Sequence, residues 1–363
     1  MTSRVELARK SRGITQAELA KSIGVTAKAI SKYEKTGEGL GEKTIAKIAN
    51  YLNYPVSFLF GGEIELPNEA SVSFRARSKM TSRDRNRALS LIPLGESLSK
   101  WMEANFNLPE TDIPDFSNYD PQTAATALRL QWQLEFAPIE NMIATLEAHG
   151  VRVFSVSETS NDIDAFSFWS KKQGRPFVFL TTSKSAERRR MDAAHELGHL
   201  VLHRYADDTK ETKQRETEAN QFASAFLMPD PSFRKTVGLA PTLEQLLAAK
   251  RIWKVSAFAA TYRAHQIGRM TKWQYNNTCM IMGKMGMRTR EPNGIAPETS
   301  AVFEQIYRHL KMSDEGVGTI SEDTGIPIDF ILQLTFMGPA GVVRGNPQAK
   351  RREHAHPDNL TVV

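Results

Sequence analysis

Residues 191–203 read Met-Asp-Ala-Ala-His-Glu-Leu-Gly-His-Leu-Val-Leu-His, and this stretch decides the fold. Its apolar residues cover one helical face and no proline interrupts them, so it predicts a buried helix. On that helix His195 and His199 lie one turn apart on the same face, and Glu196 lies roughly 100° to one side. A catalytic zinc ion needs neutral nitrogen ligands, an open position for water and a base beside that water. The stretch therefore predicts His195 and His199 as zinc ligands and Glu196 as the catalytic base.

A catalytic zinc site needs a third protein ligand, and the sequence offers His203 first. It lies about 12 Å along the helix from His195, at roughly 1.5 Å per residue, so one ion cannot reach both. His203 is therefore expected to support or pack against the site. A metzincin pattern also fails, because Leu202 and Tyr205 stand where its glycine and third histidine belong. The third ligand must be a carboxylate from another helix.

Residues 216–229 are predicted to form that second helix, which ends at the sequence Met-Pro-Asp-Pro. Glu216 and Asn220 are four residues apart and share one face. This pairing places Glu216 on the zinc ion and leaves Asn220 to orient a ligand histidine, as residues around a metal centre commonly do. Glu218 points elsewhere and is the alternative third ligand.

Two segments within residues 188–229 carry a family resemblance: R-R-R-M-D-A-A-H-E-L-G-H-L-V-L-H and E-T-E-A-N-Q-F-A-S-A-F-L-M-P. They resemble the ImmA/IrrE family of zinc metallopeptidases, most strongly over residues 150–230. The resemblance implies a zincin-like domain with gluzincin-type ligation, in which two histidines and a downstream glutamate bind zinc. Those roles fall on His195, His199 and Glu216, with Glu196 as general base. It also implies a protein substrate, often a helix-turn-helix repressor that is cut under stress or in mobile elements.

The N-terminal sequence contains two short helices joined by a glycine turn. Thr15 and Glu18 form a capping box for the first helix, Gly24 makes the turn, and Thr26 caps the second helix. This arrangement is a helix-turn-helix. The segment T-Q-A-E-L-A-K-S-I-G-V-T-A-K-A-I-S-K-Y-E resembles the Cro/CI-type (Xre) helix-turn-helix family, over residues 4–60.

In a helix-turn-helix the second helix lies in the major groove of DNA. The side chains expected to face the groove are Gln16, Ala27, Lys28, Ser31 and Lys32. Positive charge is concentrated nearby, because residues 1–60 carry ten Lys/Arg against five Asp/Glu and residues 71–90 carry six against one. This concentration is expected of a nucleic-acid contact surface.

The sequence predicts a mainly helical α+β protein of several domains. The expected order is a helix-turn-helix domain (1–62), a basic linker (63–90), the metallopeptidase domain (91–235), a helical C-terminal region (236–343) and a disordered tail (344–363). Strands are expected at residues 151–156, 165–169 and 176–180, where apolar residues alternate or cluster. The methionine-rich residues 280–287 have no evident role, and His354 and His356 in the tail are expected to be solvated.

Composition restricts the setting. The chain has one cysteine, Cys279, so no intramolecular disulfide can form, which fits a reducing cytoplasm. No run of 18 apolar residues exists, so no membrane span or membrane partner is expected. We therefore expect a cytoplasmic protein, encoded by a bacterium, a phage or a mobile element.

Three functions compete. The first is a homodimeric regulator that binds operator DNA and also carries a Zn²⁺ metalloendopeptidase, which cuts a protein regulator. The second is a transcription factor whose metallopeptidase fold is a non-proteolytic sensor or dimerisation module. The third is an antitoxin that binds a toxin through its C-terminal part, and the sequence offers no feature for toxin binding. The intact Glu196 favours the first function, because a structural metal site needs no base.

Overall fold

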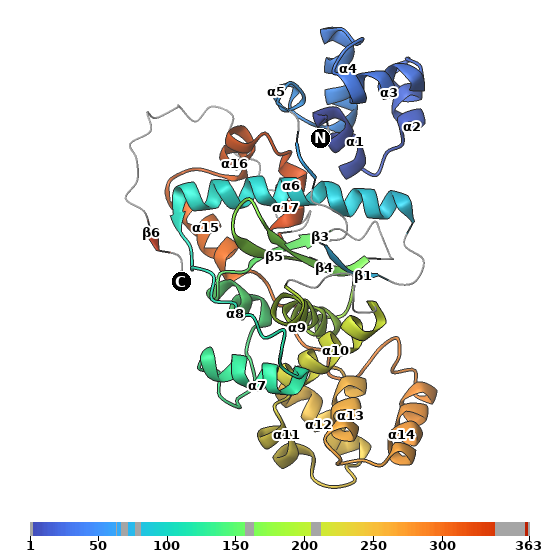
Figure 1. Ribbon diagram of the computed structural model, residues 1–363, viewed down its shortest axis with the longest axis vertical. Coiled ribbons are helices and arrows are strands. Elements are labelled where there is room, and N and C mark those ends of the chain that lie inside the picture. Colours follow the sequence, from blue (N-terminus) through green and yellow to red (C-terminus); the bar gives the residue numbers. More distant parts are fainter. Residues whose placement is uncertain are drawn as a thin grey trace. The chain divides into compact units, whose positions relative to one another are not determined.

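The computed structural model describes residues 3–62, 64–66, 72–76, 81–156, 163–204, 212–337 and 360–361 (Figure 1). The chain forms two compact units, and each contains segments that are separate in sequence. The first contains Met1–Pro109, Phe154–Ile163 and Ala301–Val363, and the second contains Glu110–Val153 and Asp164–Ser300. Both units are mainly helical, and the predicted α+β class is confirmed.

The elements of the first unit are α1 (Arg4–Ser11), α2 (Gln16–Ile23), α3 (Ala27–Thr36), α4 (Glu42–Leu52), α5 (Val56–Leu59), β1 (Ser73–Ala76), α6 (Ser82–Asn105), β2 (Phe106–Asn107), α15 (Ala301–Met312), α16 (Val317–Thr324), α17 (Ile328–Leu334) and β6 (Leu360–Thr361). The strand β3 (Arg152–Val156) begins in the second unit and ends in the first. The strand β4 (Ile163–Ser170) lies in the second unit from its second residue onward. The other elements of the second unit are α7 (Pro121–Gln131), α8 (Met142–Ala148), β5 (Arg175–Thr181), α9 (Ala186–Leu202), α10 (Thr212–Leu227), α11 (Asp230–Val237), α12 (Leu243–Trp253), α13 (Ala257–Gln266) and α14 (Lys272–Lys284).

The N-terminal helices form as their capping residues predict. The Thr15 hydroxyl accepts a hydrogen bond from the backbone N–H of Glu18. The Glu18 carboxylate accepts one from the backbone N–H of Thr15, so the capping box is complete. Gly24 closes α2 with φ of 76°, a left-handed conformation that glycine adopts without steric cost. Thr26 then caps α3. The predicted helix-turn-helix arrangement is confirmed.

The segment predicted as a basic linker is partly helical. Thr81 caps α6, so residues 82–90 belong to this long helix, and Ala88, Leu89 and Ser90 are buried. The apolar face of α6 begins at Ala88, after first turns that carry mostly charged residues. The basic composition of residues 71–90 therefore did not indicate a helix in the sequence. Residues 63, 67–71 and 77–80 lie outside the described part of the chain.

The C-terminal helices of the first unit pack against its helix-turn-helix. Asp329 of α17 accepts two bonds from the Arg12 guanidinium, one of them at 3.1 Å and the other shorter. The same guanidinium lies 4.1 Å from the ring centre of Phe330. The ring centres of Tyr54 and Phe330 lie 5.7 Å apart. The predicted C-terminal region 236–343 is therefore divided: its helices α12–α14 lie in the second unit, whereas α15–α17 lie in the first.

A β-hairpin in the second unit supports the helix that carries the HExxH sequence. Strands β4 and β5 are antiparallel, with Ala165 opposite Leu180 and Phe168 opposite Phe177. Phe166 and Phe179 stack at 4.6 Å between ring centres. Alternate residues of β4 point to opposite faces. Ser167 accordingly bonds to a side chain of α9, and the Trp169 indole N–H donates at 3.4 Å to the carbonyl of Leu200 in the same helix.

No helix among the described residues combines the length and the apolar character needed to cross a membrane. The predicted tail 344–363, with His354 and His356, lies outside the described residues except for Leu360 and Thr361. These two residues form β6, which pairs in parallel with β2.

Candidate metal centre

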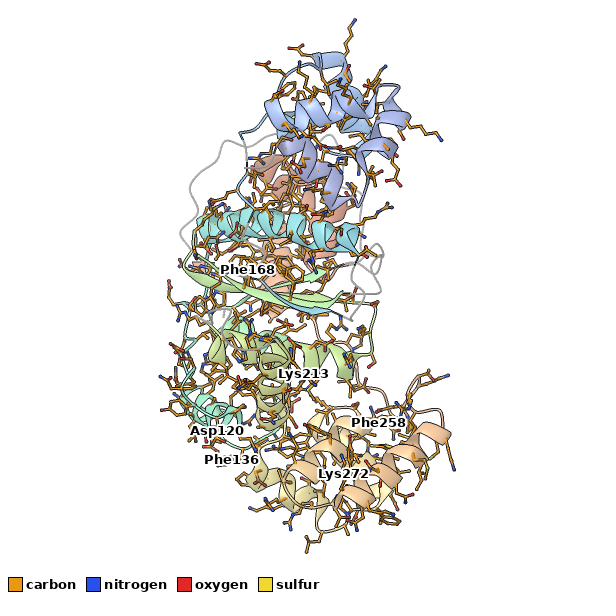
Figure 2. All side chains as sticks on the ribbon, turned by 45° about the vertical axis from the view of Figure 1, so that its right-hand side comes forward. Asp120, Phe136, Phe168, Lys213, Phe258 and Lys272 are labelled. Atoms are coloured by element: carbon orange, nitrogen blue, oxygen red, sulfur yellow. The ribbon has the colours of Figure 1, made fainter. Side chains whose placement is uncertain are left out.

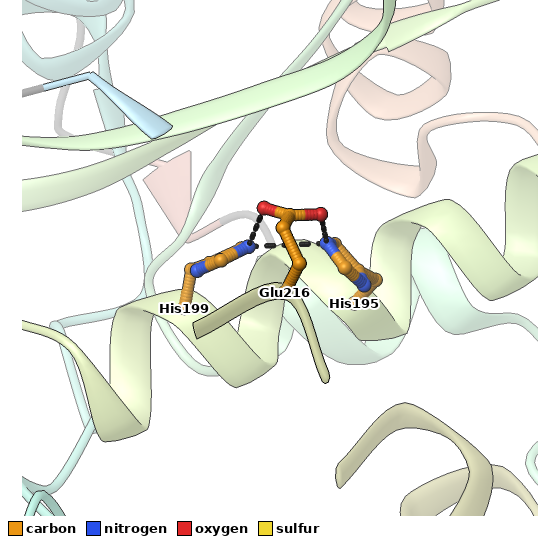
Figure 3. Close-up of side chains that lie close together, drawn as sticks. All are labelled: His195, His199 and Glu216. Atoms are coloured by element: carbon orange, nitrogen blue, oxygen red, sulfur yellow. Dashed lines mark hydrogen bonds and ion pairs between the residues drawn. The ribbon is translucent and has the colours of Figure 1, made fainter. Parts of the chain in front are cut away.

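The two histidines of the HExxH sequence face each other on α9, as their spacing predicts. Ser185 caps this helix by accepting from the backbone of Arg188, and the helix then continues without interruption through Leu202. The Nε2 atoms of His195 and His199 lie 3.0 Å apart (Figure 3). Both side chains are buried, so their positions are set by packing as well as by helix geometry.

Glu216 on α10 brings a carboxylate to the same point. Its Oε1 lies 3.1 Å from Nε2 of His199, and its Oε2 lies 3.4 Å from Nε2 of His195 (Figure 3). The three ligand atoms lie within 4.8 Å of one another. Burial raises the pKa of Glu216, but the adjacent imidazole rings of His195 and His199 outweigh that effect, so the net pKa lies below its ordinary value. The carboxylate is thus held in the ionised form that a metal ligand requires.

Gly198 allows α10 to approach this closely. A Cβ atom at this position would lie 3.1 Å from the Phe222 ring and 3.2 Å from the Cα atom of Ala219. Both neighbours belong to α10, so the glycine within the HExxH sequence sits where the two helices touch. Its missing side chain brings the backbone of α10 near enough for Glu216 to reach the histidines.

Asn220 fixes the orientation of His195. Its amide oxygen lies 3.0 Å from Nδ1 of His195, and an amide oxygen can only accept, so Nδ1 carries the hydrogen. The lone pair of His195 is then on Nε2, which faces the other two donors. Asn220 thus occupies the position predicted for it, one turn after Glu216 on α10.

A second chain of bonds fixes His199. Nδ1 of His199 lies 3.1 Å from Nδ1 of His203, and Nε2 of His203 lies 2.8 Å from the Glu218 carboxylate. Because a carboxylate accepts, Nε2 of His203 donates, and when the His203 ring is neutral its Nδ1 accepts from Nδ1 of His199. The lone pair of His199 is therefore also on Nε2. Glu218, the alternative third ligand, is bonded to His203 in this structure.

The donor set fits a divalent metal ion of the zinc type. Two imidazole lone pairs and an ionised carboxylate converge within about 3 Å of one another, which is electrostatically unfavourable without a cation between them. Two nitrogens and one carboxylate oxygen, with a fourth position left for water, are the ligands of a catalytic zinc site. The Glu216 side chain is 33% exposed, so the centre has a side open to solvent.

Glu196 follows His195 in α9 and is fully buried. Its Oε2 accepts from the Ser167 hydroxyl on β4 at 2.6 Å. Ser167 was not identified from the sequence. The only local signal is a polar residue between Phe166 and Phe168 in an apolar strand, and the pairing of that strand with α9 is a tertiary feature.

The predicted DNA-facing residues lie mostly on the surface of α3. Ala27, Lys28 and Lys32 are exposed and Ser31 is half-buried. Gln16 differs, because its amide donates at 2.6 Å to Glu34. Glu34 is buried and is also bonded to Arg9 at 2.7 and 2.9 Å. Gln16 is therefore positioned by an ion pair that the local sequence pattern did not reveal.

Comparisons with known proteins agree with these two centres. Residues 146–265 match the sequence model of the IrrE N-terminal-like domain of the M78 peptidase family, and residues 5–59 match a helix-turn-helix model. The chain is thus similar to a helix-turn-helix domain over residues 5–59 and to an IrrE N-terminal-like domain over residues 146–265. The IrrE N-terminal-like domain, as matched, contains α9 and α10 and extends through most of α13. Both predicted resemblances are confirmed.

Two curated relatives match a short part of the chain. Both are named as uncharacterized HTH-type transcriptional regulators, one from Sinorhizobium medicae (strain WSM419) and one from Rhizobium meliloti (strain 1021). Each is 41% identical over 58 residues, which cover 16% of this chain and 42% of the relative. The chain thus spans less than half the length of these relatives.

Proposed function

We propose that the protein is a DNA-binding transcriptional regulator whose IrrE N-terminal-like domain is an active zinc metalloendopeptidase. The observation that carries this proposal is the convergence of His195, His199 and Glu216 beside a buried glutamate. A structural metal site has four protein ligands and no need of a base. Here the described residues supply three donors, one side is open to solvent, and Glu196 is adjacent in sequence to His195.

Each residue then has a defined task in peptide hydrolysis. His195, His199 and Glu216 would hold a zinc ion, which when bound would polarise the scissile carbonyl and lower the pKa of a water molecule toward about 7. Glu196 would accept the proton of the attacking water and return it to the departing amine nitrogen. Ser167 holds one carboxylate oxygen of Glu196 through its hydroxyl and so fixes the direction of the other. Asn220 and His203 hold the two ligand rings in the tautomer that presents Nε2.

The helix-turn-helix domain is proposed to bring the protein to an operator. In this proposal α3 enters the major groove, Lys28 and Lys32 neutralise phosphates, and Ala27 and Ser31 meet base edges. A homodimer would bind two half-sites of a pseudo-palindrome. The proposed substrate is a protein regulator, such as another helix-turn-helix repressor, as the family resemblance implies. The proposed setting is the cytoplasm of a bacterium.

The deciding experiment compares cells that produce the wild type with cells that produce Glu196→Gln. Mass spectrometry of new N-termini should find at least one regulator fragment with the wild type, and chelation of zinc should abolish it. Glu244→Gln is the matched control, because Glu244 is an exposed glutamate at the start of α12. Fragments that persist in Glu196→Gln at wild-type amounts would refute the peptidase.

A second candidate is a transcription factor whose metallopeptidase fold is a sensor without proteolysis. One observation favours it: the helix-turn-helix is bonded to α6 and α17 rather than joined only by a linker. The Arg87 guanidinium donates at 3.2 Å to the carbonyl of Ser11, and Arg12 is paired with Asp329. A helix-turn-helix domain that is bonded to α6 and α17 can respond to a conformational change in these helices. This candidate keeps zinc but requires no role for Glu196 as a base.

A further inference from the structure

The methionine-rich residues 280–287 have two different environments. Met282 and Met287 are buried, and they pack with Ala257 in a small core to which Phe258 and Cys279 also contribute. Met280 and Met285 instead have 50% and 60% of their surface exposed. The first pair thus explains how α14 is held in the fold, and the second pair has no such role.

Other large apolar side chains are exposed with them. Trp273 is 74% exposed and stands seven residues before Met280, so the two lie almost in line along α14, opposite Met282. Ile281 is exposed beside Met280, and Met285 follows at the end of the helix. We name these four residues the α14 ridge: Trp273, Met280, Ile281 and Met285. Several large apolar side chains exposed on one helix are more than the singly scattered apolar residues of an ordinary surface, and they indicate an interaction surface.

Helix α14, which carries the α14 ridge, lies at the edge of its helix group. Figure 1 shows α14 at the edge of the group formed by α11–α14, and Figure 2 places Lys272 at this helix and Phe258 on the neighbouring α13. The exposed fractions show that the other described elements of the second unit leave the α14 ridge open.

Positive charge predominates in the sequence around the α14 ridge. Residues 245–290 contain no Asp or Glu but nine Lys/Arg. Three of the nine are used inside the fold: Lys250 bonds to Glu187 and Glu291, Lys254 to Glu140, and Arg263 to the carbonyl of Met228. The other six are Arg251, Arg269, Lys272, Lys284, Arg288 and Arg290. Four of these stand at the ends of the ridge: Lys272 beside Trp273, and Lys284, Arg288 and Arg290 around Met285.

We propose that the α14 ridge is a docking site for an acidic amphipathic helix of another protein. Trp, Met and Arg are enriched at protein interfaces, whose centres are apolar and whose rims are polar. Methionine side chains adapt their shape to a partner helix. Basic residues at both ends of the ridge complement carboxylates that flank an apolar helix face.

Two other occupants fit less well. A second copy of the chain would bring two positively charged rims together, and like charges across an interface are unfavourable. Single-stranded nucleic acid stacks its bases on successive aromatic rings. The α14 ridge has one aromatic residue, Trp273, and three aliphatic side chains. The proposal is independent of zinc and of peptidase activity, because none of the residues near the metal centre takes part.

The test uses the full chain and a fluorescein-labelled synthetic peptide of about 18 residues, with Leu at the positions of one helix face and Glu at the others. Fluorescence anisotropy should give a Kd on the order of 10 µM. Replacing every Glu by Lys should weaken binding at least about tenfold, and so should scattering the Leu residues around the helix. The double variant Trp273→Ser/Met280→Ser should also lose at least about tenfold.

Leu130→Ser is the matched control, because Leu130 is a 56% exposed apolar residue on α7. It should bind the peptide as the wild type does, and all variants should melt within a few degrees of it. Equal binding by the double variant and Leu130→Ser would overturn the proposal, as would the absence of binding to the wild type. A single-stranded oligonucleotide that binds more tightly than the peptide, and loses affinity in the double variant, would replace the protein partner by nucleic acid.

Discussion

At the residue scale, the proposed metal centre depends on side chains that bond to the Nδ1 atoms of His195 and His199, opposite the Nε2 atoms that would bind the metal. Asn220 and His203 each bond to the Nδ1 atom of one ligand ring, and so direct both Nε2 lone pairs to one point. Such partners orient the ligands and raise their basicity. The sequence predicted Asn220 from its spacing relative to Glu216. It left His203 with only a general supporting role, since its bond to Glu218 requires α10 to lie against α9.

We predict that Asn220→Ala and His203→Ala each weaken zinc affinity about 10–100-fold without removing the site. Competition with a chromophoric chelator measures this change. Glu218→Gln should weaken binding less than His203→Ala, because the amide can still accept from the His203 ring. Glu244→Gln serves as the control. Wild-type affinity in both Asn220→Ala and His203→Ala would show that the ring orientations do not depend on these bonds.

At the element scale, local signals predicted most helices correctly. Thr15, Glu18, Gly24 and Thr26 define the helix-turn-helix because caps and left-handed turns are encoded within a few residues. The start of α6 was missed, since its first turns are charged and its apolar face becomes evident only after residue 87. The division of the C-terminal helices between two units was also missed. It depends on long-range contacts such as Arg12 with Asp329, which no local pattern reveals.

The exposed lysines of α3 are predicted to set the affinity for operator DNA. Lys28→Ala and Lys32→Ala should each weaken binding across sequences and reduce the salt dependence of log Kd by about 0.9 per lost phosphate contact. Gln16→Ala should change both DNA affinity and the stability of the domain, because the Gln16 amide donates to Glu34 inside the domain. Fluorescence anisotropy at several salt concentrations measures the slope.

The control for this series is Lys100→Ala, since Lys100 is an exposed lysine on α6. It should leave the affinity and the slope unchanged. If Lys28→Ala and Lys32→Ala also left both unchanged, α3 would not be the helix in the groove.

At the scale of the whole molecule, the two proposed activities belong to different units. The helix-turn-helix domain lies in the first unit, whereas His195, His199 and Glu216 lie in the second. A flexible linker over 63–90 would have kept the two activities independent. Residues 82–90 are instead part of α6, which is bonded to the helix-turn-helix domain through Arg87. A flexible linker therefore cannot be the reason for DNA binding to be independent of the state of the proposed metal centre.

We predict equal operator affinity for wild type and Glu196→Gln, each with and without zinc, because the ligand residues and the DNA-facing residues share no unit. The measurement is a titration of labelled operator with each of the four protein forms. A zinc-dependent change of about tenfold that persists in Glu196→Gln, equivalent to about 1.4 kcal/mol, would contradict this prediction. It would favour the sensor candidate.

The account's central claim is that α9 and α10 together build a zinc centre with His195, His199 and Glu216 as ligands. Elemental analysis of purified protein tests this claim most directly. We predict about one zinc ion per chain in the wild type and the loss of most of it in His195→Ala and in Glu216→Ala, with Glu244→Gln unchanged. Full zinc occupancy in Glu216→Ala would contradict the ligand set, and full occupancy in both ligand variants would place the metal elsewhere in the chain.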